Sequence, residues 1–207
     1  YLMEYKNKKL IIEKVKVENI VKSYGTPAYC YSFNQLKKNI NNFKRNFKTF
    51  SPLICFAIKS NTNLGLIKEI KKFGLGADVV SMGELMLALR AGINPNKIVF
   101  SGVGKTSEEI KFAIDKKILL INAESESEVK EIDRIGYLKR KKVQIGIRLN
   151  PNTDAKTISQ ISTGKKENKF GVNEKTLIKL IKFCKKAQNI KLKCLSVHIG
   201  SQILDHK

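Results

Sequence analysis

The chain has 207 residues, of which 42% are hydrophobic and 28% are charged; this is enough apolar material for a globular core and excludes disorder as the dominant state. The formal charge of +22 comes from 40 basic and 18 acidic residues, but the excess is mainly lysine spread along the chain, so we expect no nucleic-acid partner. No apolar run approaches the roughly eighteen residues that cross a bilayer, and residues 1–17 lack the apolar stretch of a signal peptide, so we expect a cytoplasmic protein without a membrane partner.

The first predicted elements are a strand, a turn and a helix. Residues 10–17 alternate in polarity like a strand, and residues 24–27 hold a glycine and a proline that indicate a turn. Residues 34–47 form a predicted helix, which Ser32 and Gln35 are expected to cap. The apolar stripe of this helix consists of Leu36, Ile40, Phe43 and Phe47.

From residue 51 onward the chain repeats a short apolar strand, a polar turn and an amphipathic helix. Near-continuous apolar strands of this kind are typical of parallel sheets that are covered on both faces. The predicted strands are residues 53–58, 77–80, 97–100, 118–121, 143–149 and 192–199.

The helices between these strands carry recognisable start signals. A hydroxyl residue followed three positions later by glutamate predicts a capping box, in which each side chain accepts a backbone amide of the first turn. The three matches are Ser81 with Glu84, Thr106 with Glu109, and Ser125 with Glu128. Gly92 is expected to end the second of the interstrand helices, and residues 173–187 form a later helix.

The spacing of the strands favours a parallel α/β fold, either an open sheet or a barrel. Six strands do not close a barrel of eight. The chain ends a few residues after a strand and starts without methionine, so we expect an incomplete TIM-type (β/α)8 barrel, truncated at its C-terminal end. Residues 150–171 are polar and glycine-containing, which is typical of an active-site loop.

Polar residues follow the carboxyl ends of the predicted strands, where parallel α/β proteins form their sites. They are Lys59 to Asn61, Ser81, Ser101 with Gly102, Asn122 with Glu124, Arg148 with Asn150, and His198 with Gly200 and Ser201. Lys59 has two interpretations. Either it reaches solvent at a strand end, or it shares a barrel-facing side with Cys55 and Ala57, where lost solvation favours the neutral amine.

The other candidates also have two interpretations each. His198 either stacks on a flat ring at the strand mouth or is a satisfied edge group, and the small residues Gly200 and Ser201 are suited to present donors to a phosphate. Arg148 is either an anion clamp or the partner of a structural ion pair. His206 is expected to be solvated near the chain end.

Three other kinds of site are not predicted. Residues 102–106 (GVGKT) resemble the tail of a phosphate-binding loop, but the required earlier glycine is Val99, inside a strand. No nucleophile-elbow sequence supports a Ser-His-Asp relay. The four cysteines form no C-x-x-C pair, so we expect neither disulfides nor a metal site; they are Cys30, Cys55, Cys184 and Cys194.

Residues 56–61 (FAIKSN) resemble the cofactor-lysine motif of the barrel-type (fold type III) pyridoxal-phosphate decarboxylases. This family includes the diaminopimelate, ornithine and arginine decarboxylases and, more distantly, alanine racemase. Further stretches are similar to the diaminopimelate decarboxylases in particular, in order over about residues 24–202. They are 76–85 (GADVVSMGEL), 98–106 (IVFSGVGKT), 148–151 (RLNP), 161–164 (ISTG), 169–171 (KFG) and 198–202 (HIGSQ).

The resemblance implies pyridoxal 5'-phosphate as cofactor, attached to Lys59 through a Schiff base. It implies that His198 stacks on the pyridine ring, that Ser201 lies near the phosphate, and that Asp78 and Arg148 line the ring's surroundings. Lys59 and His198 are then the catalytic residues. A loop over the site would include Ser162, Thr163, Gly164 and Lys169.

The activity implied by the resemblance is decarboxylation of meso-diaminopimelate to L-lysine with release of CO2, by a protein that is a homodimer when full length. Residues 1–31 would then be an N-terminal segment that joins a missing C-terminal β domain, and residues 32–207 the cofactor-binding barrel domain. Several family features lie in the later half of such enzymes and are not found here: the acid that pairs with the pyridine nitrogen, the glycine-rich phosphate loop and the cysteine contributed across the dimer. We therefore expect a fragment that is inactive alone.

Two alternatives remain open. One is a related enzyme, either an ornithine or arginine decarboxylase or an alanine-racemase-like protein. The other is a non-catalytic, lysine-rich nucleic-acid-binding protein, which would show salt-dependent retention on DNA and no yellow cofactor colour.

Overall fold

The computed structural model describes residues 3–153 and 170–201. Its main unit is a parallel sheet whose strands lie side by side in chain order. The strands are β4 (Cys55–Ala57), β5 (Gly76–Val79), β6 (Ile98–Phe100), β7 (Leu120–Ala123), β8 (Val143–Leu149) and β9 (Ile190–Val197). Helices follow most strands: α3 (Leu64–Lys72), α4 (Met82–Arg90), α5 (Ser107–Asp115), α6 (Glu126–Lys139) and α7 (Glu174–Lys186), with single 3-10 turns η1 (Ile58–Ser60) and η2 (Pro95–Lys97).

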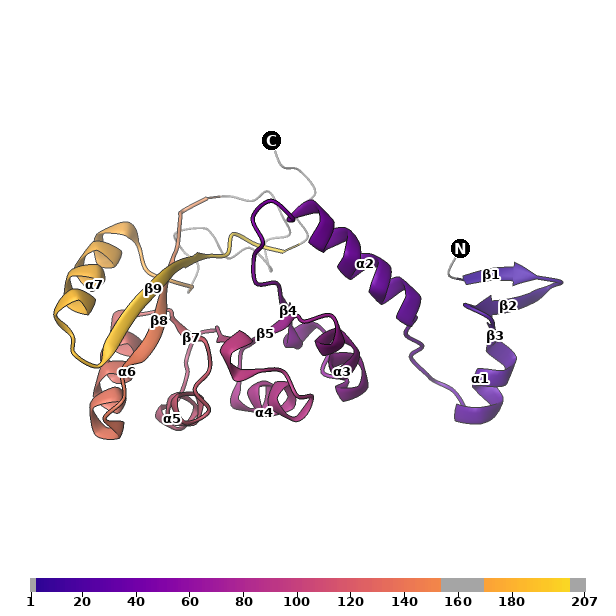
Figure 1. The fold of residues 1–207 in the computed structure, drawn as a ribbon, viewed down its shortest axis with the longest axis horizontal. Coiled ribbons are helices and arrows are strands. Elements are labelled where there is room, and N and C mark those ends of the chain that lie inside the picture. Colours follow the sequence, from indigo (N-terminus) through magenta and orange to yellow (C-terminus); the bar gives the residue numbers. More distant parts are fainter. Residues whose placement is uncertain (1–2, 154–169, 202–207) are drawn as a thin grey trace.

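The sheet curves, and these helices lie along its outer side (Figure 1). Strictly sequential parallel strands with outer helices are the arrangement of a (β/α) barrel. Six strands are described, so the prediction of an incomplete barrel is confirmed over the described residues. None of the helices in this part of the chain is both long and apolar enough to span a bilayer.

The core lies between the sheet and its helices. Ile67 of α3, Leu85 of α4, Ile110 of α5 and Ile132 of α6 are completely buried there, and Phe100 of β6 is buried with them. Burial of these apolar side chains is the main force that holds each helix against the sheet.

Strand β8 has the predicted bounds, but β7 and β9 are displaced by two residues. Residues 118–121 were predicted as a strand, whereas β7 is Leu120–Ala123. The amide of Ile118 instead bonds the carbonyl of Ala113 and closes α5, next to Lys117 at φ 53°. This is a helix C-terminal motif, in which an apolar residue follows the helix end and packs against it. The same apolar residue also fits the pattern of a strand. The apolar pattern alone therefore placed the strand too early.

All three predicted hydroxyl caps are present, but only α5 has the full capping box. Ser81, Thr106 and Ser125 each accept the amide three residues later at 3.2 Å. The carboxylate of Glu109 in turn accepts the amide of Thr106 at 3.0 Å. In α4 and α6 the glutamate instead accepts the amide of the residue before the cap, Val80 or Glu124 respectively.

The predicted strand 10–17 is wrong as a single element. The structure has a small antiparallel sheet of β1 (Met3–Lys6), β2 (Lys9–Ile12) and β3 (Val15–Lys16), followed by the short helix α1 (Val17–Tyr24). Glu13 interrupts the run at φ 55°. Its carboxylate accepts hydrogen bonds from the hydroxyl of Ser32 and from the amide of Asn34. Because Glu13 bonds residues far along the chain, the local sequence pattern does not indicate this contact.

Helix α2 (Phe33–Asn46) forms where it was predicted, and Ser32 accepts the amide of Gln35 at 3.0 Å. Its apolar stripe is only partly buried. Ile40 is buried, whereas Phe43 and Phe47 stay partly exposed and stack on each other with ring centroids 4.8 Å apart. Two of the four residues of the predicted apolar stripe are therefore exposed in the described structure.

Gly76 is required where β5 passes close to its neighbours. A Cβ atom there would lie 2.1 Å from the carbonyl oxygen of Lys97 and 2.8 Å from Sγ of Cys55. We expect Gly76→Ala to lower the free energy of unfolding by about 3 kcal/mol, because backbone has to move to relieve the overlap. Denaturant titration of the protein measures this.

Gly83 in α4 is the matched control, because a Cβ there meets nothing closer than Ser81 Oγ at 3.8 Å. The same substitution should stabilise by about 0.5 kcal/mol through the lower entropy of the unfolded chain. Equal effects of the two substitutions would contradict the close approach at Gly76.

Candidate active site

A cavity of about 470 Å³ opens at the carboxyl ends of the six parallel strands. Its volume lies in the range of about 300–1,000 Å³ that is usual for small-molecule sites. Every strand of the sheet contributes a residue in the strand or directly after it. The lining residues are Lys59, Asp78, Val80, Ser101, Gly102, Val103, Asn122, Glu124, Arg148, Phe170, Ser196, Val197 and His198.

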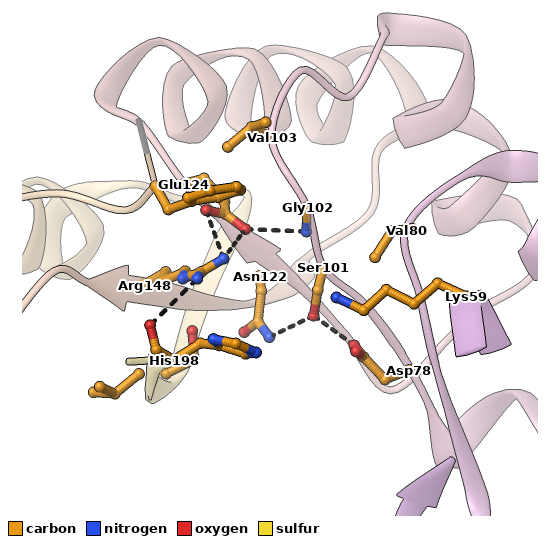
Figure 2. A pocket seen from close by; sticks show the side chains of 13 residues that line it. Lys59, Asp78, Val80, Ser101, Gly102, Val103, Asn122, Glu124, Arg148 and His198 are labelled. Carbon is orange, nitrogen blue, oxygen red and sulfur yellow. Dashed lines mark hydrogen bonds and ion pairs between the residues drawn. The ribbon is translucent and has the colours of Figure 1, made fainter. Parts of the chain in front are cut away.

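Lys59 enters the cavity from η1, not from the strand that was predicted to run through residue 58. The chain turns after Ala57, and the hydroxyl of Ser60 donates to the carbonyl of Ala57 at 2.7 Å. Ile58 is completely buried and anchors the turn. The side chain of Lys59 then points toward Ser101 and Asp78 (Figure 2). Lys59 is exposed, so of its two interpretations the lysine that reaches solvent at the strand end is the one observed, and it does so within the opening of the cavity.

Asp78 of β5 faces Lys59 and is tied into the wall of the cavity. The hydroxyl of Ser101 donates to its Oδ1 at 2.5 Å, and Asn122 Nδ2 donates to Ser101 Oγ at 3.2 Å. Burial raises the pKa of Asp78, while the bond from Ser101 and the positive charge of Lys59 act against that rise. The three side chains form a hydrogen-bonded row across β5, β6 and β7 (Figure 2).

Arg148 of β8 is paired with Glu124, which follows β7. Its Nη1 donates to both carboxylate oxygens, at 2.9 and 3.1 Å, and the amide of Gly102 donates to Oε1 at 3.0 Å. Only 1% of the Glu124 side chain and 11% of the Arg148 side chain are exposed. The guanidinium also lies 4.9 Å from the ring centroid of Phe170. Of the two interpretations of Arg148, the ion pair is observed, and it forms within the cavity wall.

His198 follows β9 and lines the cavity opposite Lys59 (Figure 2). His198 is exposed over part of its surface; partial burial of the imidazole lowers its pKa, and the positive charges of Arg148 and Lys59 lower it further. Neutral imidazole is therefore favoured near pH 7. Ser201 is exposed and is not among the residues that line the cavity.

The predicted loop residues cannot be placed, because Ser162, Thr163, Gly164 and Lys169 lie outside the described residues.

Two buried polar atoms in the cavity wall lack a hydrogen-bond partner among the described residues: Asn122 Oδ1 and Ser196 Oγ. Buried polar atoms are normally paired in proteins, so these two are suited to meet a polar ligand. The side chain of Asn122 lies across Gly146 of β8, its partner in register. A Cβ at Gly146 would lie 2.2 Å from Asn122 Oδ1.

The sequence did not assign roles to several of these residues. Ser101, Asn122 and Glu124 were recognised only as polar strand ends, and their mutual bonds depend on sheet register. Ser196 had a usable signal, because a period of two along β9 places it on the same side as His198. Phe170 lacked one, since its contact with Arg148 joins residues from separate segments.

Comparison with known proteins gives a consistent picture. Residues 33–207 match the family model described as pyridoxal-dependent decarboxylase, pyridoxal binding domain. Diaminopimelate decarboxylase of Helicobacter pylori strain J99 is 47% identical over 188 residues, which are 91% of this chain and 46% of the relative. The enzyme of the same name from Aquifex aeolicus is 41% identical over 98% of this chain and 48% of its own length.

A solved structure is similarly close. Diaminopimelate decarboxylase of M. jannaschii, in complex with L-lysine, has a TM-score of 0.91 at 34% identity, over 98% of this chain and 49% of that one. The chain thus spans about half the length of the relatives that it matches.

Glu124 is expected to hold Arg148 in the wall, so that Glu124→Gln leaves a nearly buried guanidinium without its counter-charge. We expect this substitution to lower the free energy of unfolding by about 3 kcal/mol, as measured by denaturant titration. Glu126→Gln is the control two residues away. Glu126 forms an exposed pair with Lys130, so its loss should change little. Similarly small changes in the free energy of unfolding at both positions would show that the ion pair of Glu124 with Arg148 does not contribute to stability.

The titration of His198 tests the charge arrangement of the cavity. In the protein without added ligand, we expect an imidazole pKa below 6.5, rising in Lys59→Met, which removes a nearby positive charge, and falling further in Asp78→Asn. At a pH between the lowered pKa of His198 in the folded protein and its ordinary pKa in the unfolded chain, the unfolded state binds more protons than the folded state. This ionisation therefore makes the free energy of unfolding fall as pH drops through that window.

Proton NMR against pH measures this pKa, and the His198→Gln variant identifies the resonance. No change in the pKa on removal of either neighbouring charge would rule out the described proximity.

Proposed function

Because the chain belongs to the pyridoxal-dependent decarboxylase family, we propose that its cavity binds pyridoxal 5'-phosphate and that Lys59 is the residue that holds it. The observation that carries this proposal is the convergence of four groups on one cavity. The amine of Lys59, the carboxylate of Asp78, the guanidinium of Arg148 and the imidazole of His198 all line it.

The chemistry of these groups fits the cofactor. A primary amine is the group that reacts with an aldehyde, and Lys59 presents one in the open part of the cavity. A neutral imidazole offers a flat face to a pyridine ring, as proposed for His198. The unpaired atoms of Asn122 and Ser196 supply polar partners for substituents of the ring.

Each residue then has a defined task. Lys59 and His198 are the proposed catalytic residues, since both reach the reacting region. Asp78 faces the amine of Lys59 and is held in the cavity wall by the hydrogen bond from Ser101. Arg148 contributes positive charge beside the ring, oriented by Glu124. Ser201 is the proposed donor to the phosphate.

The loop that contains Ser162, Thr163, Gly164 and Lys169 is proposed to cover the site and exclude water.

The proposed reaction of the full-length protein is decarboxylation of meso-diaminopimelate to L-lysine. Pyridoxal phosphate, when bound, supplies an electron-withdrawing ring that stabilises the charge left on the substrate's α-carbon as CO2 departs. Support comes from relatives that are 41–47% identical and are named for this activity, and from the related structure solved with L-lysine.

We also propose the wider organisation of the full-length protein. Residues 32–207 are its cofactor-binding barrel portion, and residues 1–31 join a second, β-rich domain. Support for the latter is that Met3, Tyr5 and Val15 of the small sheet are exposed apolar residues, as a surface covered by another domain would be. A homodimer in the cytoplasm completes the proposal.

Reduction with borohydride tests the role of Lys59. After incubation of the full-length protein with pyridoxal phosphate and reduction, peptide mass spectrometry should find the cofactor fixed to Lys59. Lys59→Arg should lose this label, and CO2 release from meso-diaminopimelate should fall by about 1000-fold. Lys68→Arg, an exposed position on α3, is the control and should retain both.

A label on another lysine in the wild-type protein would contradict the assignment. Faster CO2 release from ornithine or arginine than from meso-diaminopimelate would leave the cofactor site standing but reject the proposed substrate.

A further inference from the structure

The side chain of Lys105 lies outside the cavity and is buried, with only 1% of it exposed. An ammonium group has three protons to donate, and all three have an acceptor here. Nζ lies 2.6 Å from the carbonyl oxygen of Gly102, 2.7 Å from that of Asn122 and 2.7 Å from Oε1 of Glu128. The ammonium also lies 5.5 Å from the ring centroid of Phe100.

These bonds show what the GVGKT segment does. Its likeness to a phosphate-binding loop suggests a lysine that reaches an anion, but Lys105 turns toward backbone carbonyls of its own sheet. With its donors engaged, it is not a phosphate ligand in this structure. Gly102 and Gly104, at φ 92° and 73°, allow the backbone to fold over the lysine.

The two carbonyls belong to residues that line the cavity, one after β6 and one in β7. We propose that Lys105 is a positioning residue: by tying these two strand ends together, it fixes the cavity wall from behind. The inference rests on the proposed function, because the wall that it fixes is the proposed cofactor site.

The connection from Lys105 to the cavity is short. The amide of Gly102 donates to Glu124, and Glu124 holds Arg148. From the other side, Glu128 pairs with Lys105 and accepts the amide of Glu124 at 3.2 Å. Two positive and two negative side chains thus balance each other, and both sides of the network meet at Glu124.

The ion pair of Lys105 with Glu128 is not well explained by a contribution to stability alone. Removing two charges from water costs about as much as their attraction returns, so buried pairs are weak evidence for stability. Removing one partner is costly, whereas replacing both by apolar residues is often neutral. Stability and positioning can therefore be separated by experiment.

The test compares Lys105→Met with the double variant Lys105→Met/Glu128→Met in the full-length protein. The single variant should be less stable and bind pyridoxal phosphate more weakly. The double variant should regain stability but still bind pyridoxal phosphate about 10- to 100-fold more weakly than wild type, because the ties to Gly102 and Asn122 remain absent. The absorbance of the bound cofactor and its dissociation constant report this.

A second readout needs no cofactor. Hydrogen exchange of the Gly102 amide, which is bonded to Glu124, should be faster in both variants than in wild type. Ile135→Ala serves as the stability control, since Ile135 is fully buried on α6 and does not line the cavity. It should lower stability while leaving cofactor affinity and Gly102 exchange unchanged.

Wild-type affinity and exchange in the double variant would overturn the inference, and so would an equal loss of affinity in Ile135→Ala. A wild-type protein that binds no pyridoxal phosphate would instead overturn the proposed function, and the inference with it. If the wild-type protein binds pyridoxal phosphate and the double variant binds it equally well, only the inference about Lys105 is rejected.

Discussion

The ion pair between Arg148 and Glu124 is the interaction on which the arrangement of the cavity depends. It joins β8 to the end of β7, and through the amide of Gly102 it reaches the end of β6. Because both side chains are nearly buried, removing either one leaves the other charge without a counter-charge and lowers stability. Their bond therefore fixes the relative positions of three strand ends, and with them the residues that face Lys59.

Much of the fold follows from patterns that the sequence carries openly. Apolar strands at regular spacing, separated by hydroxyl and glutamate helix starts, predict parallel βα units, and β8 and α2 lie where expected. The failures have identifiable causes. The apolar residue Ile118 ends a helix instead of entering a strand, and Glu13 breaks a predicted strand because it bonds Ser32 and Asn34 far along the chain. Such contacts are tertiary and leave no periodic trace.

The site divides in the same way. Lys59, Asp78, Arg148 and His198 were identified from strand ends and from family motifs, and the structure places them around one cavity. The sequence could not reveal which polar residues form hydrogen bonds or ion pairs with each other. The bonds of Ser101 to Asp78 and of Glu124 to Arg148 depend on the alignment of neighbouring strands. Ser201 was expected beside the same ligand, yet the described structure leaves it exposed outside the lining.

Gly146 shows how chemistry on one strand limits the composition of the next. The amide side chain of Asn122 occupies the space that a methyl group on β8 would need. A methyl group there would also lie 2.7 Å from Sγ of Cys194 on β9, so a side chain at position 146 would overlap residues of both neighbouring strands. Any redesign that adds a side chain at position 146 would therefore have to make room on β7 and on β9 together.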